Sequence, residues 1–227
     1  MSNTRSDSAR ATAARICAHL LTLEPTPTRT LVAIAGPPVS GKSTVAELVV
    51  EALCQQEDNS FSRAALVPMD GYHLDNHLLD ARGLRARKGA PETFDATGFC
   101  EGIRRLASAT EFVYLPRFDR TRDLAIANSI AIAPQTPIVV VEGNYLFLDS
   151  EPWSSLDDMF TTTVFLRPSL ETLKRRLIQR WLDHGLTPEQ ASQKANENDI
   201  PNAQRVLKQS RPADLCLDND SECGSAP

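Results

Sequence analysis

The sequence has no apolar run that approaches the ~20 residues of a membrane span. Its start, MSNTRSDSAR, is polar and lacks the apolar stretch of a secretory signal. The net charge is -5, so the chain also lacks the positive charge that a broad electrostatic grip on nucleic acid requires. We therefore expect a soluble, cytoplasmic protein that binds neither a membrane nor nucleic acid.

Cysteine is scarce as well, and the five cysteines are scattered without the spacing of metal ligands. We interpret them as buried small hydrophobic residues or spare thiols in a reducing compartment. They are Cys17, Cys54, Cys100, Cys216 and Cys223. What the chain does have is 227 residues of which 41% are hydrophobic, enough for one domain with a sizeable core and room for an inserted lobe.

Short continuous apolar runs, typical of strands covered on both faces, alternate with segments of helical period. The expected strands lie at 31–35, 64–69, 112–115, 137–141, 162–166 and 211–217, and 129–133 can form a hairpin with 112–115. This alternation implies a mostly parallel sheet with helices on both faces. We expect an α/β fold with three layers, α/β/α, around a mostly parallel five-stranded sheet, preceded by a helix within residues 9–23.

The stretch GPPVSGKST, residues 36–44, contains the phosphate-binding pattern G-x-x-x-x-G-K-[ST] from Gly36 to Ser43. An apolar strand precedes it and an amphipathic helix follows it, which is the context of a working loop rather than of a chance Gly-rich turn. Pro37 and Pro38 have no N–H, so later residues must bind the phosphates at the start of a helix whose dipole favours anions. The expected donors are the backbone N–H groups of Val39, Ser40, Gly41, Lys42, Ser43 and Thr44.

Two side chains of this loop predict the cofactors. Lys42 would neutralise the β- and γ-phosphates of a nucleoside triphosphate, and the Ser43 hydroxyl would bind Mg²⁺. Glu142 ends the apolar strand PIVVV and lies at the edge of the sheet where ligands gather, so it can hold Mg²⁺ or its water shell. The alternative for Glu142 is a strand-end acid that faces solvent.

Asp70 in VPMDGYH is the second acid that follows an apolar strand. A carboxylate there could accept or align the proton of an acceptor hydroxyl, and Gly71 allows the chain to turn sharply after it. The alternative is a turn aspartate that bonds its own backbone. Tyr72 and His73, which follow, are substrate contacts or packing residues.

Two absent motifs narrow the class of nucleotide-binding protein. The guanine-specific N-K-x-D and the transport-ATPase signature L-S-G-G-Q do not occur. The strand PIVVV also ends in Glu142-Gly143, not in the Asp-Glu pair common in ATPases that hydrolyse for work. A metabolite kinase remains, with a nucleotide-binding regulator or weak NTPase without an acceptor as the alternative.

The order of these motifs, with a later Arg-rich helix, resembles the superfamily of uridine kinases, phosphoribulokinases and type I pantothenate kinases over about residues 30–217. RKGAPETFD (87–95) resembles a stretch of pantothenate kinases, and YLPRFDR (114–120) resembles the P-x-Y-D segment that lines the acceptor pocket of uridine kinases. VVVEGNYLFLDSEPW and ENDIPNAQRV are most similar to a compact bacterial branch often labelled fructose-transport-system kinase or pantothenate-kinase-like protein. The His-Pro and His-Ser-Arg residues of uridine kinases are missing, and the chain is shorter than type I pantothenate kinases.

The resemblance implies a substrate-side flap at about 71–95. In it Arg87 and Lys88 would face anionic groups, and Glu92 or Asp95 would face hydroxyls. From the residues alone the basic stretch could equally be a solvated loop, and Asp95 could cap the following helix.

Two residues of PRFDR are also candidates for the acceptor pocket. Arg117 and Asp119 would meet the acceptor, or they would form an exposed ion pair that contributes little to stability.

A lid is expected at about 169–198, beginning with a helix from Ser169 to Gly185. Arg176 and Arg180 lie on one flank of its apolar stripe, where the arginines of lid-bearing kinases stabilise transition-state charge, and Arg175 points away. Of the two, Arg176 is the first candidate for this role and Arg180 the second. TPEQ (187–190) is a capping box that starts another helix. In the family the loop at Arg211 borders adenine, so Arg211 is expected to stack on the base.

Together these features predict an ATP- and Mg²⁺-dependent kinase that phosphorylates a hydroxyl of a small metabolite, such as fructose or another sugar, a nucleoside or a pantothenate-like molecule. The expected catalytic residues are Lys42, Asp70, Arg176 and Arg180. The expected organisation is a helix and linker at 1–29, a P-loop kinase domain at 30–217 and a disordered tail at 218–227. The sequence leaves the oligomeric state open, with a homodimer as one option.

Overall fold

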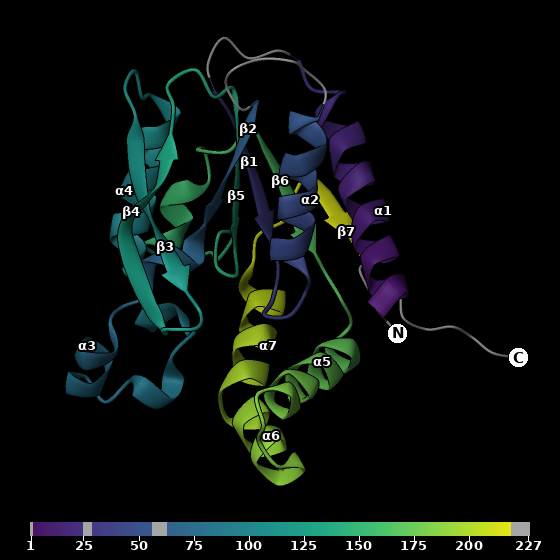
Figure 1. The fold of residues 1–227 in the computed structure, drawn as a ribbon, viewed down its shortest axis with the longest axis vertical. Helices are drawn as coiled ribbons and strands as arrows, with labels where there is room; N and C mark the ends of the chain where they lie inside the picture. Colours follow the sequence, from purple (N-terminus) through teal and green to yellow (C-terminus); the bar gives the residue numbers. More distant parts are fainter. Residues whose placement is uncertain (1, 25–28, 56–62, 219–227) are drawn as a thin grey trace, which may run out of the picture.

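Five parallel strands form the central sheet, in the order β2-β5-β1-β6-β7 (Figure 1). They are β1 (Thr30–Ala35), β2 (Ala64–Pro68), β5 (Ile138–Gly143), β6 (Thr162–Leu166) and β7 (Leu215–Leu217). In this computed structural model of the chain, residues 2–24, 29–55 and 63–218 are described. The expected α/β class and five-stranded parallel sheet are confirmed.

Both faces of the sheet are covered, because alternate residues of its strands belong to two different hydrophobic clusters. On β1, Leu31 and Ala33 pack with one cluster, whereas Val32 and Ile34 pack with the other. The first cluster includes Phe99 and neighbouring residues of α4 (Ala96–Ala107). The second includes residues of α1 (Ser2–Leu20) and α2 (Lys42–Cys54), which lie together on the other side of the sheet in Figure 1. The result is the expected three-layer arrangement.

Two further strands, β3 (Val113–Asp119) and β4 (Leu124–Ile132), form an antiparallel hairpin outside the main sheet. The pairing expected between 112–115 and 129–133 is correct, but both strands are longer than the apolar runs suggested. Their register shifts between Leu115 and Arg117, around Pro116, so the alternation of inward and outward side chains is interrupted there. The hairpin tip points toward the carboxyl end of the sheet (Figure 1).

A group of helices stands at the carboxyl end of the sheet (Figure 1); it contains the residues 169–198 expected to form a lid, continues to Gln209, and is called the lid below. It comprises α5 (Leu170–Asp183), α6 (Pro188–Lys194), a π-helical turn (Ala195–Asp199) and α7 (Ile200–Gln209). Ser169 caps α5 by accepting a bond from the Thr172 N–H, and Thr187 forms the expected capping box with Gln190. Leu177, Ala195 and Ile200 form the buried centre of this lid.

The segment between β2 and α4 contains short helical pieces: 3₁₀ turns at Met69–Tyr72, Arg85–Arg87 and Pro91–Thr93, and α3 (Asn76–Ala81). A further 3₁₀ turn spans Trp153–Leu156. Asp95 caps α4, because its Oδ1 accepts a bond of 2.9 Å from the Gly98 N–H, so the capping alternative is the correct one. The tail at 219–227, with Cys223, and residues 25–28 of the linker lie outside the described residues. No helix in the described part is long and apolar enough to cross a membrane.

Candidate active site

A cavity of about 520 Å³ opens at the carboxyl ends of the central strands. The phosphate loop, the ends of β2 and β5, the hairpin and α5 all contribute to its wall. Because these strands are parallel and in register, with Pro68 of β2 opposite Glu142 of β5, residues that follow them meet at one edge. The charged residues that line it are Lys42, Glu47, Asp70, Arg117, Arg120, Glu142 and Arg180.

The phosphate loop fits an anion at the start of α2. Gly41 has a φ of 89°, a left-handed conformation that glycine adopts without strain, and it offers no side-chain cap to the helix. Within the described residues, the N–H groups of Lys42, Ser43 and Thr44 have no hydrogen-bond partner. Ser40 differs from the expectation: its N–H donates to the Pro37 carbonyl at 3.1 Å, because the loop closes a tight turn there. The Ser40 N–H is therefore occupied in this state, and phosphate binding by the other N–H groups of the loop, Val39 included, stays a prediction.

Val39 is the unusual residue of this loop, because its φ of 58° lies in the left-handed region that β-branched residues rarely adopt. Its side chain packs against the lid cluster around Leu177, and its carbonyl accepts a bond of 3.4 Å from Arg176 Nη1. Such strain persists only where neighbouring contacts hold the residue. The lid therefore contributes to the shape of the phosphate loop.

Lys42 and Glu142 form the buried polar centre of the site, with exposed fractions of 9% and 4%. Burial lowers the pKa of Lys42, an effect that the nearby Glu142 and Asp70 carboxylates oppose. Burial raises the pKa of Glu142 to about 7, against the influence of Lys42. The Ser43 hydroxyl donates to Glu142 Oε1 at 3.2 Å, so Glu142 does not simply face solvent.

Asp70 lies in the turn after β2 and lines the same cavity. Its carboxylate pairs with Arg120 at 2.9 Å and, among the described residues, does not bond its own backbone as the turn alternative requires. Gly71 makes this possible, because a Cβ at this position would lie 2.2 Å from the Pro116 carbonyl oxygen. Only glycine permits the bulge of the hairpin to approach the Asp70 turn this closely.

The two lid arginines occupy different places. Arg180 lines the cavity, where it pairs with Asp199 at 3.1 Å and its guanidinium lies 4.9 Å from the centre of the Trp181 ring. Arg176 instead donates to the Val39 carbonyl of the phosphate loop and is not among the residues that line the cavity. Arg175 is exposed, as expected from the helical period. The structure thus brings Arg180, rather than Arg176, to the cavity.

Comparison with known proteins assigns the chain to a family. The model of the "Phosphoribulokinase / Uridine kinase family" matches residues 31–219. The chain belongs to this family. The resemblance drawn from the motifs is therefore confirmed, and the protein is a kinase.

Three relatives show how far the similarity extends. A "putative fructose transport system kinase" from Silicibacter sp. TM1040 is 43% identical, with a TM-score of 0.83 over 90% of this chain and 98% of that one. The "Uncharacterized protein YggC" of Escherichia coli (strain K12) is 37% identical over 86% of this chain and 79% of its own length. The "Putative uridine kinase C227.14" of Schizosaccharomyces pombe is 31% identical over 83% of each chain. Membership of the family implies the use of ATP and a small-molecule substrate.

Several residues expected at the substrate side of this kinase lie outside the cavity wall. His73 is held between the rings of Phe94 and Phe118, with centroids 4.0 and 4.5 Å away, and burial lowers its pKa. Tyr72 packs edge-to-face on Phe99 at 5.2 Å. Both residues pack the base of the flap in this state.

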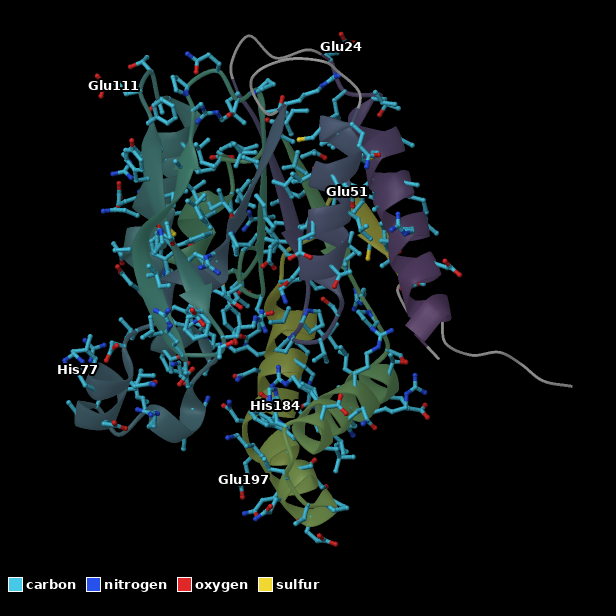
Figure 2. All side chains as sticks on the ribbon, viewed as in Figure 1. Glu24, Glu51, His77, Glu111, His184 and Glu197 are labelled. Atoms are coloured by element: carbon cyan, nitrogen blue, oxygen red, sulfur yellow. The ribbon has the colours of Figure 1, made fainter. Side chains whose placement is uncertain are left out.

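The charged residues of the flap pair with one another and with neighbouring elements. Lys88 bonds Asn76 at 2.7 Å and Asp123 of the hairpin turn at 2.8 Å. Arg87 pairs with Glu92 at 3.0 Å, and Glu92 lies 3.7 Å from Arg205. Figure 2 shows His77 on α3 of the flap, well separated from His184 and Glu197 of the lid. A substrate contact by Arg87, Lys88 or Glu92 stays a prediction.

Asp119, Arg117 and Arg211 complete the set of predicted residues. Asp119 stabilises the hairpin turn, since its Oδ1 accepts bonds from the N–H groups of Thr121 and Arg122, whereas Arg117 lines the cavity. The two do not form the ion pair considered from the sequence. Arg211 pairs with Asp157 and lies 5.2 Å from the Phe147 ring centre, so stacking on adenine stays a prediction.

Arg120 and Asn144 are among the cavity residues that sequence reasoning missed. Asn144 follows Glu142-Gly143 directly, and within the described residues its buried Oδ1 has no hydrogen-bond partner. Arg120 stands in the quoted stretch YLPRFDR, one position after Asp119. The residues that match known motifs are their neighbours, Asp119 and Glu142-Gly143. The Arg120 and Asn144 side chains reach the site only because the hairpin and the end of β5 fold next to it.

Proposed function

We propose that this kinase transfers the γ-phosphoryl group of ATP to a hydroxyl group of a small metabolite bound in the cavity. One observation carries the proposal: Asp70 lines the same cavity as Lys42, Ser43 and Glu142. A carboxylate that can address a hydroxyl thus stands beside a loop that fits a polyphosphate. Transfer of this group needs little covalent chemistry from the protein, so position and charge supply the rate.

The phosphate side of the cavity, formed by the phosphate loop and Glu142, binds the phosphates of ATP and neutralises their charge. The N–H groups of Lys42, Ser43 and Thr44 and the Lys42 ammonium group bind the phosphate oxygens. Ser43 and Glu142 would hold Mg²⁺, and their oxygen atoms suit this ion. When bound, Mg²⁺ supplies positive charge to the phosphates. No group of three or more His, Cys, Asp and Glu side chains in the described residues could hold a metal ion.

The acceptor side positions the hydroxyl. Asp70 orients the hydroxyl and takes its proton as the oxygen forms a bond to the γ-phosphorus. The bond from that phosphorus to the bridging oxygen of the β-phosphate breaks, and ADP leaves. Arg180 reaches the cavity from the lid and stabilises the charge that develops on the transferred group. Arg176 acts through the loop at Val39.

The names of the relatives differ in the acceptor, since one is described as a "putative fructose transport system kinase" and another as a "Putative uridine kinase". A sugar, a nucleoside and a pantothenate-like molecule are therefore all candidates. The test measures ADP formation from MgATP with and without fructose, other sugars, nucleosides and pantothenate. Formation that an additive stimulates supports transfer, and slow formation that is the same with every additive supports the alternative, a nucleotide-binding regulator or weak NTPase.

A further inference from the structure

Arg117 differs from the other cations of the cavity wall. Arg120 pairs with Asp70, Arg180 pairs with Asp199, and Lys42 interacts with Glu142. The Arg117 side chain, by contrast, has neither an ion pair nor a hydrogen bond to any described residue, although it lines the cavity. A planar guanidinium group is the side chain best suited to bind a carboxylate or a phosphate through two parallel bonds.

We propose that the acceptor is itself an anion, a hydroxyl compound that carries a carboxylate or a phosphate, and that Arg117 binds this group. The inference rests on the proposed function and specifies its substrate class. It makes Arg117 a specificity-determining residue of the acceptor side, separate from the residues that bind the nucleotide.

The position of Arg117 follows from the close approach of the hairpin to the Asp70 turn. A Cβ on Gly71 would lie 2.7 Å from the Pro116 carbonyl carbon and 3.2 Å from the Arg117 nitrogen. The backbone of Arg117 is therefore fixed beside the residue that follows Asp70. The phosphate loop follows β1, which β5 separates from β2 in the sheet. Arg117 thus belongs to the side of the cavity where the hydroxyl is addressed.

The anionic group of the acceptor has a second role, which is to draw Arg120 away from Asp70. It occupies the Asp70 carboxylate, yet its own side chain is 72% exposed, so the pair is weakly held in solvent. An anionic group bound at Arg117 competes with Asp70 for Arg120. Binding of the charged acceptor then releases the Asp70 carboxylate for the hydroxyl, and water alone does not.

Asn144 adds a polar requirement. Its Oδ1 atom is buried at the cavity wall without a partner among the described residues, and a buried acceptor of this kind is normally satisfied. A hydroxyl group of the ligand would supply the missing donor. The acceptor class is therefore a hydroxy acid or a sugar phosphate with more than one hydroxyl.

The first experiment compares acceptors that differ in the anionic group. The carboxylate arm uses glycerate against glycerol and pantothenate against pantothenol, and the phosphate arm uses fructose 6-phosphate against fructose and ribose 5-phosphate against ribose. The charged member of at least one pair should have a kcat/KM at least about tenfold higher, and the arm that responds identifies the group. Equal or better use of the neutral members overturns the inference while transfer to a hydroxyl stands. ADP formation that a nucleoside stimulates but no member of either arm does overturns the inference alone. ADP formation that none of these compounds stimulates overturns the inference and the proposed function together.

The second experiment changes Arg117 in the same assays. Arg117→Gln should raise the KM for the charged acceptor at least about tenfold and leave the KM for ATP within about twofold, because only acceptor binding is lost. Arg117→Lys should recover part of the affinity. Calorimetry of the same charged acceptor, with a non-hydrolysable ATP analogue present, should show the same loss of affinity.

Arg122→Gln is the matched control. Arg122 stands in the turn of the same hairpin, pairs with Asp119 at 3.7 Å and is 69% exposed, and it is not among the residues that line the cavity. The control should keep the KM of the unchanged protein for both substrates. An equal effect of the two variants, or an effect of Arg117→Gln on ATP alone, overturns the assignment of Arg117 to the acceptor.

Discussion

The phosphate side and the acceptor side of this cavity are built in different ways. The phosphate side comes from one continuous stretch, the loop before α2, together with Glu142 on the neighbouring strand. The acceptor side is assembled from the turn after β2, the bulge of the hairpin and the residue after Gly143. Under the proposed function, a local motif thus specifies nucleotide binding, whereas tertiary contacts determine which acceptor fits. Damage to either side should produce a different kinetic signature.

The largest effect is expected from Lys42→Ala. Removal of this buried ammonium group should lower kcat by about 10²–10³-fold, because charge stabilisation in a site shielded from water is lost. Steady-state assays with the best acceptor measure the change. Lys174→Ala, at an exposed position of α5, is the control and should behave as the unchanged protein. Normal phosphoryl transfer by Lys42→Ala would contradict the assignment of Lys42 to phosphate binding.

Gly71→Ala should damage the acceptor side without the phosphate side. The new Cβ would meet the Pro116 carbonyl oxygen at 2.2 Å, so the hairpin must move away from Asp70. Overpacking of this kind costs about 1–3 kcal/mol of the free energy of unfolding. Chemical unfolding should show this loss, and kinetics should show a raised KM for the acceptor with nucleotide affinity retained. Equal weakening of nucleotide binding would mean that the two sides are not separable.

Glu142→Gln tests the electrostatics of the phosphate side through pH. Burial raises the pKa of Glu142 to about 7 from its ordinary value of 4.5, so the folded chain binds more protons than the unfolded chain between these values. The stability that this group contributes is thus fully present below about pH 4.5 and is lost as the pH rises through about 7.

Urea unfolding at several pH values, without nucleotide or Mg²⁺, checks this direction. The unchanged protein should lose on the order of 1–3 kcal/mol between pH 5 and 8 relative to Glu142→Gln. Glu151→Gln, at an exposed acid, is the control. A pH profile of Glu142→Gln parallel to that of the unchanged protein would show that burial does not hold the Glu142 proton.

The smallest effect concerns the contact between the phosphate loop and the lid. Val39→Ala removes packing against the lid cluster and keeps the left-handed conformation, whereas Val39→Gly removes the packing and the strain together. Val39→Ala should therefore be the less stable variant, by about 1 kcal/mol. Thermal unfolding of the two variants measures the difference. A glycine variant that is the less stable of the pair would mean that Val39 is not strained.

Sequence patterns were sufficient where neighbouring residues carry the signal. The phosphate loop, the caps at Ser169 and Thr187 and the strand-end acids each depend on a few consecutive residues, and the structure places them as expected. The helical period of α5 also separated the exposed Arg175 from Arg176 and Arg180.

The remaining features depend on contacts between distant segments. Arg120 and Asn144 reach the cavity because the hairpin packs on Gly71 and because β5 ends beside β2. Arg176, preferred over Arg180 from the sequence, lies against Val39 because that side chain enters the lid cluster. Neither arrangement leaves a local pattern, so periodicity could not have predicted it.

The most direct test of the central idea, that Asp70 addresses the acceptor and not the nucleotide, is a comparison of Asp70→Asn with the unchanged protein. Two quantities are measured: calorimetric affinity for MgATP, and acceptor-dependent formation of ADP. We expect the affinity to change by less than about threefold, while transfer falls by about 10²-fold or more because the carboxylate no longer takes the hydroxyl proton. Retained transfer, or a loss of MgATP affinity that accounts for the whole defect, would contradict this division of the site.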